Sequence, residues 1–402
     1  MKILINSVLF LWLLAPVIAA IKVGNTSIGT YISIFPAILF SIIIIFNRSF
    51  IIDSFNKRLI TIFFPVFFFI NMSIFFYVNE NGFRFETFTK NFLIFSVYSI
   101  FFIILSISLN NTNTINLKQI REYLKNTMLY ILYFNVLFMV IELVLSVFFK
   151  YKIILPWYSP AIISPYKPSG FFAEPAHFGE FFIIYTLIFV DNKKNKIKVK
   201  EILILLGQLI TGSIICFVST IVFIFSLINI KRRKYLLILI ILLFLVIYIN
   251  VNYNINFKDR LSQTWNYSLA LRVYKSYYVI KDIPLTKLLF GFGFAQSSLA
   301  VGYYNGEYKD IFISSGGYYS GLGNNILMIG FLGASLFEIL LAYLFIKSKG
   351  IYRGIIFGLI YLALRGVADI NVVMFNFWLV MCLLLVNYYS SLKNRKIDTN
   401  NN

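Results

Sequence analysis

The sequence has very few of the residues that bind metal ions or form disulfide bonds. Its 402 residues include one histidine, His177, and two cysteines, Cys216 and Cys382, which both lie inside apolar runs. A single histidine excludes a site built from several histidines. Two cysteines placed in this way indicate neither a disulfide framework nor a cysteine-rich metal site. We therefore expect a protein that uses no metal ion and no cofactor.

Charged residues are also scarce. They make up 13% of the sequence, and 59% of the residues are hydrophobic, whereas soluble domains are about 25% charged. Water cannot solvate so much apolar surface, so the composition predicts an integral membrane protein. The 36 Lys and Arg residues outnumber the 16 Asp and Glu residues, for a net charge of +20. Lys and Arg cluster between apolar runs, as the positive-inside rule describes for cytoplasmic loops, so we expect no nucleic acid partner. One of these predicted cytoplasmic loops contains Lys57 and Arg58, and the next contains Lys118, Arg121 and Lys125.

Several apolar runs are long enough to cross the hydrocarbon core, which takes about 20 helical residues. The first run could also be read as a secretory signal. Further spans follow it at once, and we interpret it as a retained helix. The clear candidates are Ile3–Ile21, Ile28–Phe46, Leu59–Val78, Asn91–Leu109, Met128–Phe149, Phe171–Val190, Tyr235–Val251 and Asn324–Ile346.

Two further segments each predict a pair of short helices. Ile202–Ile230 has lysine-rich loops at both ends, so a single crossing would leave one basic loop outside, against the charge rule. Two helices that turn at Thr211-Gly212-Ser213 keep both loops inside. The segment Arg353–Ser390 is interrupted in the same way at residues 365–369. The prediction is an all-α protein of about twelve transmembrane helices, with both termini cytoplasmic and residues 1–402 in a single transmembrane domain.

Two loops stand out on the predicted outer side. Residues 150–170 lead into the sixth helix, and residues 252–323 are far more than a simple connection needs. Within the second loop, the segment Leu261–Ile280 mixes apolar and aromatic residues with Arg272 and Lys275. This pattern is typical of a helix that lies at the membrane interface. We expect no soluble domain and no internal repeat.

The densest polar cluster, Lys167–Glu180, lies at the outer end of the sixth helix. Glu174 and His177 are three residues apart and share a face if the helix has begun there. Pro175 suits a first helical turn, and a carboxylate just before it meets the positive end of the helix dipole. Glu174 and His177 are therefore candidates for acid–base chemistry. The alternative is an ordinary helix cap with an interfacial histidine.

Basic side chains of the long loop are candidates for anion binding. Arg260 and Arg272 carry planar guanidinium groups, which grip phosphate oxygens in two places, and Lys275 adds a third cation. Nonspecific binding of lipid headgroups is the alternative. Gly291-Phe292-Gly293 gives the backbone freedom to approach a phosphate, but no strand precedes it, so a nucleotide-binding fold is excluded.

Ionisable residues inside membrane spans are functional candidates by default. Glu142, Glu338, Arg365 and Asp369 qualify. Arg365 and Asp369 are four residues apart, a spacing that predicts an intrahelical ion pair. Glu142 lies about two turns from the outer end of its helix. Burial would raise the pKa of its carboxyl and suit it to accept a proton; a hydrogen-bonded structural carboxyl is the alternative.

The order of these features along the chain resembles the order found in the family of O-antigen polymerases and ligases. The run Lys167-x-x-Gly170-Phe171-Phe172-Ala173-Glu174-Pro175 is similar to a segment in an outer loop of that family: a basic residue, a glycine three later, an aromatic-rich turn and a proline. The turn Leu209–Ser213 resembles its paired short helices. The similarity covers roughly residues 150–345. The matching features of the long loop and the helix after it are, in order, Arg272, the stretch Pro284–Gly293, Asn324, Asn325, Leu327, Gly330 and Gly333.

This resemblance implies a metal-independent glycosyltransferase. Its substrates would be polyprenyl-pyrophosphate-linked oligosaccharides at the outer leaflet of the cell's inner membrane, and its partners a flippase and a chain-length regulator. Glu174 or His177 would take the proton of the attacking sugar hydroxyl. The residues expected to hold the pyrophosphate are Arg272, Lys167, Arg260 and Lys275.

The sequence departs from the family pattern at three positions. Lys167 stands where arginine is usual, Ile214 where arginine is common, and Asn324 where histidine is often found. In the ligase branch that histidine is proposed to be catalytic, so its absence favours a polymerase. A ligase would share the fold and differ in its acceptor. A flippase would be expected to show pseudo-symmetry between two halves, which is not evident here. A polytopic acyltransferase would be expected to have a catalytic histidine on the cytoplasmic side of the membrane.

Overall fold

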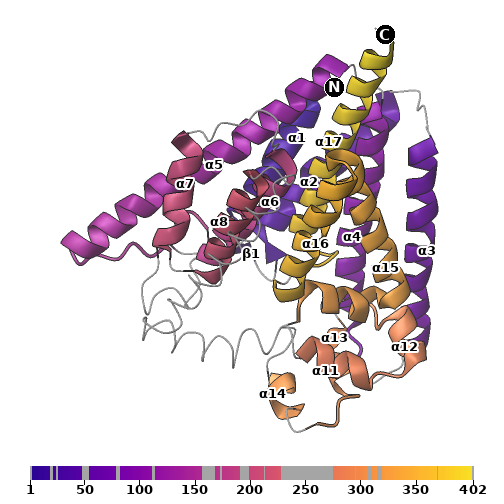
Figure 1. Ribbon diagram of the computed structural model, residues 1–402. Coiled ribbons are helices and arrows are strands. Elements are labelled where there is room, and N and C mark those ends of the chain that lie inside the picture. Colours follow the sequence, from indigo (N-terminus) through magenta and orange to yellow (C-terminus); the bar gives the residue numbers. More distant parts are fainter. Residues whose placement is uncertain are drawn as a thin grey trace. The chain divides into compact units, whose positions relative to one another are not determined.

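The structure, a computed structural model, consists almost entirely of helices (Figure 1). Two strands of two residues each, β1 (Lys22–Val23) and β2 (Thr26–Ser27), pair in antiparallel fashion within the described residues. The described residues are 2–18, 21–23, 26–47, 54–77, 82–110, 114–155, 168–172, 174–190, 199–211, 213–227, 275–294, 296–306, 309–314, 319–368 and 370–400.

Five helices in the described part of the chain are long and apolar enough to cross a membrane. This agrees with the predicted all-α class and is consistent with a polytopic membrane protein. The predicted span Tyr235–Val251 lies outside the described residues. The five helices are α2 (Ile28–Asn47), α4 (Phe85–Asn110), α5 (Thr114–Phe148), α15 (Gly321–Lys349) and α17 (Phe375–Asn400).

Two helices have bounds that differ from the prediction. α1 (Lys2–Leu14) stops well before Ile21, because Pro16 disfavours helical geometry at the residue before it and removes a backbone donor. α5 begins at Thr114 rather than Met128 and is 35 residues long. Its first turns contain Lys118, Arg121 and Lys125, residues that the sequence assigned to a loop. At about 1.5 Å per residue, such a helix is longer than the hydrocarbon core is thick.

Both predicted pairs of helices are present. α7 (Val199–Ile210) and α8 (Ile214–Leu227) are separated at the predicted turn. There the Thr211 hydroxyl donates to the Gln208 carbonyl at 2.8 Å and accepts from the Ser213 backbone N–H at 3.1 Å, so the side chain satisfies groups freed where α7 ends. α16 (Ile351–Val367) and α17 are likewise separate helices.

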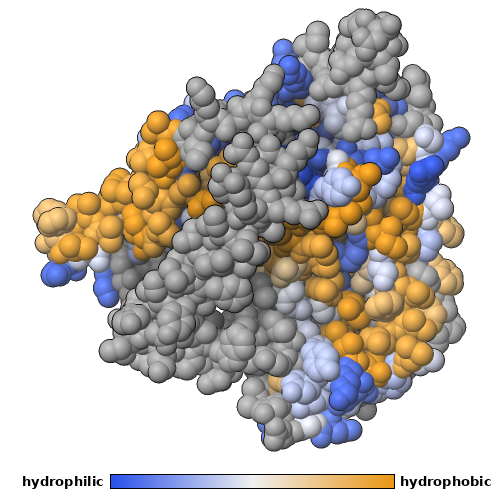
Figure 2. Space-filling view, viewed as in Figure 1, coloured by the Kyte–Doolittle hydropathy of each residue, from blue (hydrophilic) through white to orange (hydrophobic). Residues whose placement is uncertain are grey.

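The chain divides into two compact units. The first comprises residues 1–40 and 113–249, and the second residues 41–112 and 250–402. In the first unit, α6 (Pro175–Phe189) is buried along its length and packs against α8. α5 is the least covered of the five long helices, and many apolar side chains in its second half are exposed (Figure 2). Such a surface suits contact with lipid.

The second unit has an aromatic core around Trp378 of α17. The rings of Phe63 in α3 (Ser54–Tyr77), Phe95, Phe102 and Phe337 lie 5.8–6.0 Å from the Trp378 ring, between centroids. The indole N–H donates to the Val372 carbonyl at 2.7 Å. Aromatic rings of this kind contribute large buried area together with edge-to-face attraction.

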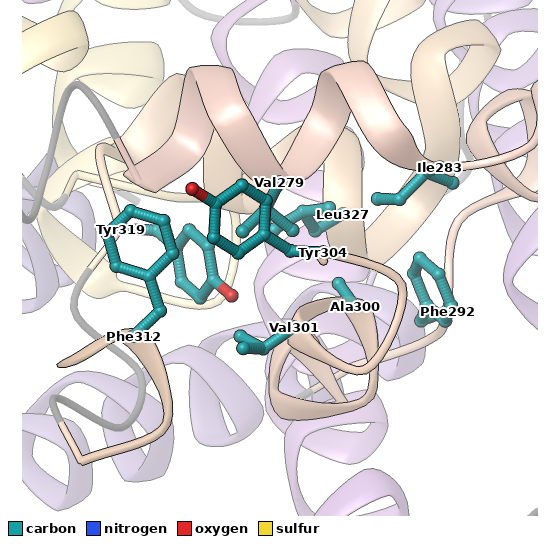
Figure 3. Close-up of a cluster of buried hydrophobic side chains, with 9 residues drawn as sticks. All are labelled: Val279, Ile283, Phe292, Ala300, Val301, Tyr304, Phe312, Tyr319 and Leu327. Atoms are coloured by element: carbon teal, nitrogen blue, oxygen red, sulfur yellow. The ribbon is translucent and has the colours of Figure 1, made fainter. Parts of the chain in front are cut away.

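The described part of the loop 252–323 is folded into a layer of short helices. These are α11 (Lys275–Asp282), α12 (Leu285–Phe290), α13 (Ser297–Val301) and α14 (Lys309–Ser314). The predicted interfacial helix Leu261–Ile280 is described only from Lys275, where α11 begins. The layer has its own apolar cluster, which includes Leu327 of α15 (Figure 3). Its members are Val279, Ile283, Phe292, Ala300, Val301, Tyr304, Phe312, Tyr319 and Leu327.

A kink in α15 joins this layer to the span. Gly330 has a φ of +73° within the helix, a value that L side chains rarely adopt. At the kink, the carbonyls of Leu327 and Met328 accept hydrogen bonds from outside the helix. The N–H of Phe292 donates to Leu327 at 2.7 Å, and the N–H of Gly293 donates to Met328 at 3.0 Å. The Gly291-Phe292-Gly293 motif is therefore used here to pack backbone against a bent helix.

Candidate functional site

The predicted polar cluster begins with a tight turn at residues 168–172. The backbone of this turn is hydrogen-bonded to side chains of α5. Glu142 is fully buried, and its Oε2 accepts from the backbone N–H groups of Ser169 at 3.1 Å and Gly170 at 2.8 Å. The Asn135 Oδ1 accepts from the N–H of Phe171 at 2.7 Å. Three consecutive backbone donors of the turn therefore end on two side chains of one helix.

Glycine is required at the centre of this turn. Gly170 has a φ of +67°, and a Cβ there would lie 2.2 Å from the Oδ1 of Asn135. The Phe171 ring stacks on Phe138 of α5 with 4.6 Å between centroids. Phe172 is buried and packs on Phe178 of α6. Backbone geometry and ring packing together fix the direction in which the chain enters α6.

Glu174 occupies the N-cap position of α6 but does not use its side chain as a cap. Its backbone is extended, with φ −146° and ψ 150°, Pro175 follows at the first helical position, and the carboxylate makes no capping hydrogen bond. The residue is half-buried. The helix therefore starts four residues after Phe171, the start of the predicted span, but Pro175 lies in the first turn as predicted, with a carboxylate at the positive end of the helix dipole.

His177 pairs with Glu180, an acid that was not among the predicted site residues. Its Nδ1 lies 3.5 Å from the Oε2 of Glu180, one turn further along α6. The His177 side chain is 47% exposed and that of Glu180 is 11% exposed. A carboxylate so placed orients the imidazole ring. The i, i+3 spacing of the two residues could have predicted this pair.

Close packing between α6 and α8 holds this segment from the other side. A Cβ on Gly179 would lie 2.8 Å from the backbone nitrogen of Cys216. The Cys216 thiol donates to the Pro175 carbonyl at 2.9 Å. The short helix α8 therefore contacts the first turn of α6, which contains His177 and directly follows Glu174.

Of the four predicted pyrophosphate ligands, one is within the described residues. Lys167, Arg260 and Arg272 lie outside them. Lys275 is fully buried at the start of α11, where its Nζ donates to the Phe312 carbonyl at 2.7 Å and lies 4.5 Å from the centroid of the Tyr319 ring. Burial lowers the pKa of its ammonium group to about 8. In this position the amine faces the interior of the layer of short helices.

A buried ion pair joins α15 to α16. The Nη1 of Arg365 lies 2.5 Å from the Oε1 of Glu338, and its Nε donates to the Ile370 carbonyl at 3.0 Å. Arg365 is fully buried. The sequence predicted an intrahelical pair with Asp369, which lies outside the described residues. Spacing along one helix reveals only local partners, so the contact with Glu338 was missed.

The arrangement around α6 offers acid–base chemistry. A half-buried carboxylate at the N-cap of α6 lies three residues before an imidazole that has its own carboxylate partner, and the turn held by α5 leads into this segment. No group of three or more His, Cys, Asp or Glu side chains within the described ranges could hold a metal ion. The chain matches no protein-family model, and a search of curated proteins found no significant match.

Proposed function

We propose that this chain polymerises oligosaccharide repeat units, each linked to a polyprenyl pyrophosphate, into a surface polysaccharide. The observation that carries the proposal is the clamped turn that presents Glu174 and the His177–Glu180 pair at the start of α6. It lies in the sequence segment that resembles the outer loop of O-antigen polymerases and ligases. The all-α architecture, with helices long and apolar enough to cross a membrane and a folded layer of short helices, suits a substrate that is itself anchored in lipid.

In the proposed reaction, a hydroxyl of the acceptor sugar attacks the anomeric carbon of the donor sugar. The new carbon–oxygen bond forms as the bond between that carbon and the pyrophosphate oxygen breaks, and the pyrophosphate leaves with the bonding electrons. Glu174 or His177 accepts the hydroxyl proton. Arg272, supported by Lys167 and Arg260, stabilises the growing negative charge of the leaving group.

The proposal includes a topology. About twelve helices cross the inner membrane of the cell, and both termini are cytoplasmic. The segments 150–170 and 252–323 then lie on the outer side, where lipid-linked repeat units arrive after a flippase has moved them. A chain-length regulator is a further expected partner.

Deletion of the gene tests the function directly. Gel analysis of surface polysaccharide should show loss of the long ladder, with a single repeat unit still attached to its final acceptor. Loss of the single unit as well would point to a ligase or a flippase, and an unchanged ladder would overturn the proposal. Wild-type protein expressed in the deletion strain should restore the ladder.

A further inference from the structure

We infer that Glu142 is a positioning residue, whose carboxylate fixes the turn of residues 168–172 and through it the start of α6. The claim that Glu142 supports catalysis rests on the proposed function, whereas the claim that it holds the turn does not. The sequence left two interpretations of this side chain open, a proton acceptor and a structural carboxyl. The geometry supports the second.

The first argument is the direction of the hydrogen bonds. The N–H groups of Ser169 and Gly170 both reach the same oxygen of Glu142, Oε2, at 3.1 and 2.8 Å. Buried backbone N–H groups need acceptors, and bonds to a carboxylate are stronger than bonds to a neutral oxygen. An oxygen that already receives two backbone donors is poorly placed to receive a proton from a substrate.

The second argument is the helix face from which the turn is held. Asn135, Phe138 and Glu142 occupy positions i, i+3 and i+7 of α5, which lie on one face. Asn135 binds the N–H of Phe171, Phe138 stacks on the Phe171 ring, and Glu142 binds the two preceding N–H groups. One face of α5 therefore binds a segment that has no regular secondary structure of its own.

The third argument is the short distance along the chain from the turn of residues 168–172 to the proposed acid–base residues. The turn closes with a hydrogen bond from the Phe172 N–H to the Ser169 carbonyl, and α6 begins at Pro175. Glu174 lies between them. If the turn is released from α5, the position of Glu174 is no longer fixed from that side.

Two substitutions separate positioning from proton transfer. Glu142→Gln keeps a carbonyl oxygen that can accept both N–H groups, but it cannot act as a base. Glu142→Leu keeps the bulk and removes the acceptor. For a positioning residue the glutamine variant is active and the leucine variant is not. For a proton acceptor both variants are inactive.

A cysteine at position 169 reports on the turn without any need for activity. Ser169 is fully buried and its hydroxyl has no hydrogen-bond partner, so Ser169→Cys removes no such bond. The native cysteines, Cys216 and Cys382, are buried and are replaced by serine and alanine. A membrane-permeant maleimide is then applied to membranes that contain the wild-type, glutamine or leucine side chain at position 142.

We expect the introduced thiol to be protected with glutamate or glutamine at position 142 and to react about tenfold faster or more with leucine there, since an unmet buried donor favours local opening. In the deletion strain, with native Ser169, we expect near-normal polymer length for Glu142→Gln and loss of long chains for Glu142→Leu. Protection of the introduced thiol in the leucine variant would overturn the inference. So would a glutamine variant that loses the polymer while the thiol stays protected.

The polymer length and the thiol labelling also distinguish a failure of the proposed function from a failure of the inference about Glu142. If deletion of the gene leaves the polysaccharide unchanged, the proposed function fails, and the labelling at position 169 still decides whether Glu142 holds the turn. If the leucine variant is degraded, the glutamine variant decides alone: retained polymer supports the inference, and lost polymer at normal protein level contradicts it.

Discussion

Lys275 shows at the scale of one residue how burial sets the charge state of a side chain. Its amine is enclosed by the apolar layer of α11–α14, with the Phe312 carbonyl and the Tyr319 ring as neighbours. Loss of hydration disfavours the charged form, and the pKa falls from 10.5 to about 8. In the unfolded chain the amine is in water again and its pKa returns to about 10.4.

The pH dependence of stability follows from this difference. Between pH 8 and pH 10.5 the unfolded chain binds the proton that the folded chain has released, so stability rises with pH across this window. Lys275→Met removes the dependence. We expect the melting temperature of the purified wild-type protein to rise relative to that of the variant between about pH 7.5 and about pH 9.5.

Lys281→Met is the matched control, because Lys281 lies on the same helix with its side chain exposed. Its melting temperature should follow that of the wild type at both pH values. A difference between wild type and Lys275→Met that stays constant with pH would show that the amine keeps its ordinary pKa in the folded protein.

Pairs of residues were the hardest feature to predict from the sequence. The spacing of Glu174 and His177 placed both at the start of α6, as the structure has them. The partners of Glu142, Arg365 and His177 were not predicted, because two of the three come from other segments. Hydropathy and spacing describe one element at a time, and contacts between elements depend on packing that neither records.

At the scale of elements, the kink in α15 has a clear physical basis. Gly330 has a φ of +73°, and a Cβ there would lie 2.1 Å from the Leu289 carbonyl oxygen. Gly330→Ala is expected to lower the free energy of unfolding by about 1–3 kcal/mol, because alanine is strained at positive φ and the neighbouring backbone must also move. The measurement is the unfolding midpoint of the protein in detergent.

Gly358→Ala in α16 provides the comparison. The nearest atom to a Cβ at that position belongs to Phe345, at 3.8 Å, which is ordinary contact. Alanine there should leave the midpoint unchanged or raise it, since glycine costs a helix interior up to about 1 kcal/mol. Equal effects of the two substitutions would mean that the kink is not needed for stability.

Helix pairs were predicted well and some helix ends were not. The break between α7 and α8 followed from basic clusters at both ends of one apolar stretch, and the structure has it at Thr211–Ser213. The start of α5 was missed because Lys118, Arg121 and Lys125 were assigned to a loop. Lysine and arginine are good helix formers, and a helix that extends beyond the membrane can carry them.

At the scale of the whole molecule, the proposal requires the two outer segments to share one side of the membrane. Tyr151 lies in the first segment and Tyr277 in the second, and both are exposed. With native cysteines replaced, Tyr151→Cys and Tyr277→Cys should react with an impermeant maleimide on cells whose outer membrane is permeabilised. Lys57→Cys, in the first turn of α3 and on the predicted cytoplasmic side, should not. Reaction of only one of the two tyrosine positions would separate the segments and remove the shared site.

The most direct measurement of the proposed activity uses purified protein and the lipid-linked repeat units that accumulate in the deletion strain. We predict that the wild-type chain converts them into a ladder and releases one polyprenyl pyrophosphate for each new linkage. Arg272→Lys, which keeps the charge but lacks the two-pronged guanidinium, should insert normally and lose most of this activity. Intact repeat units that remain unjoined by well-folded wild-type protein would contradict the account.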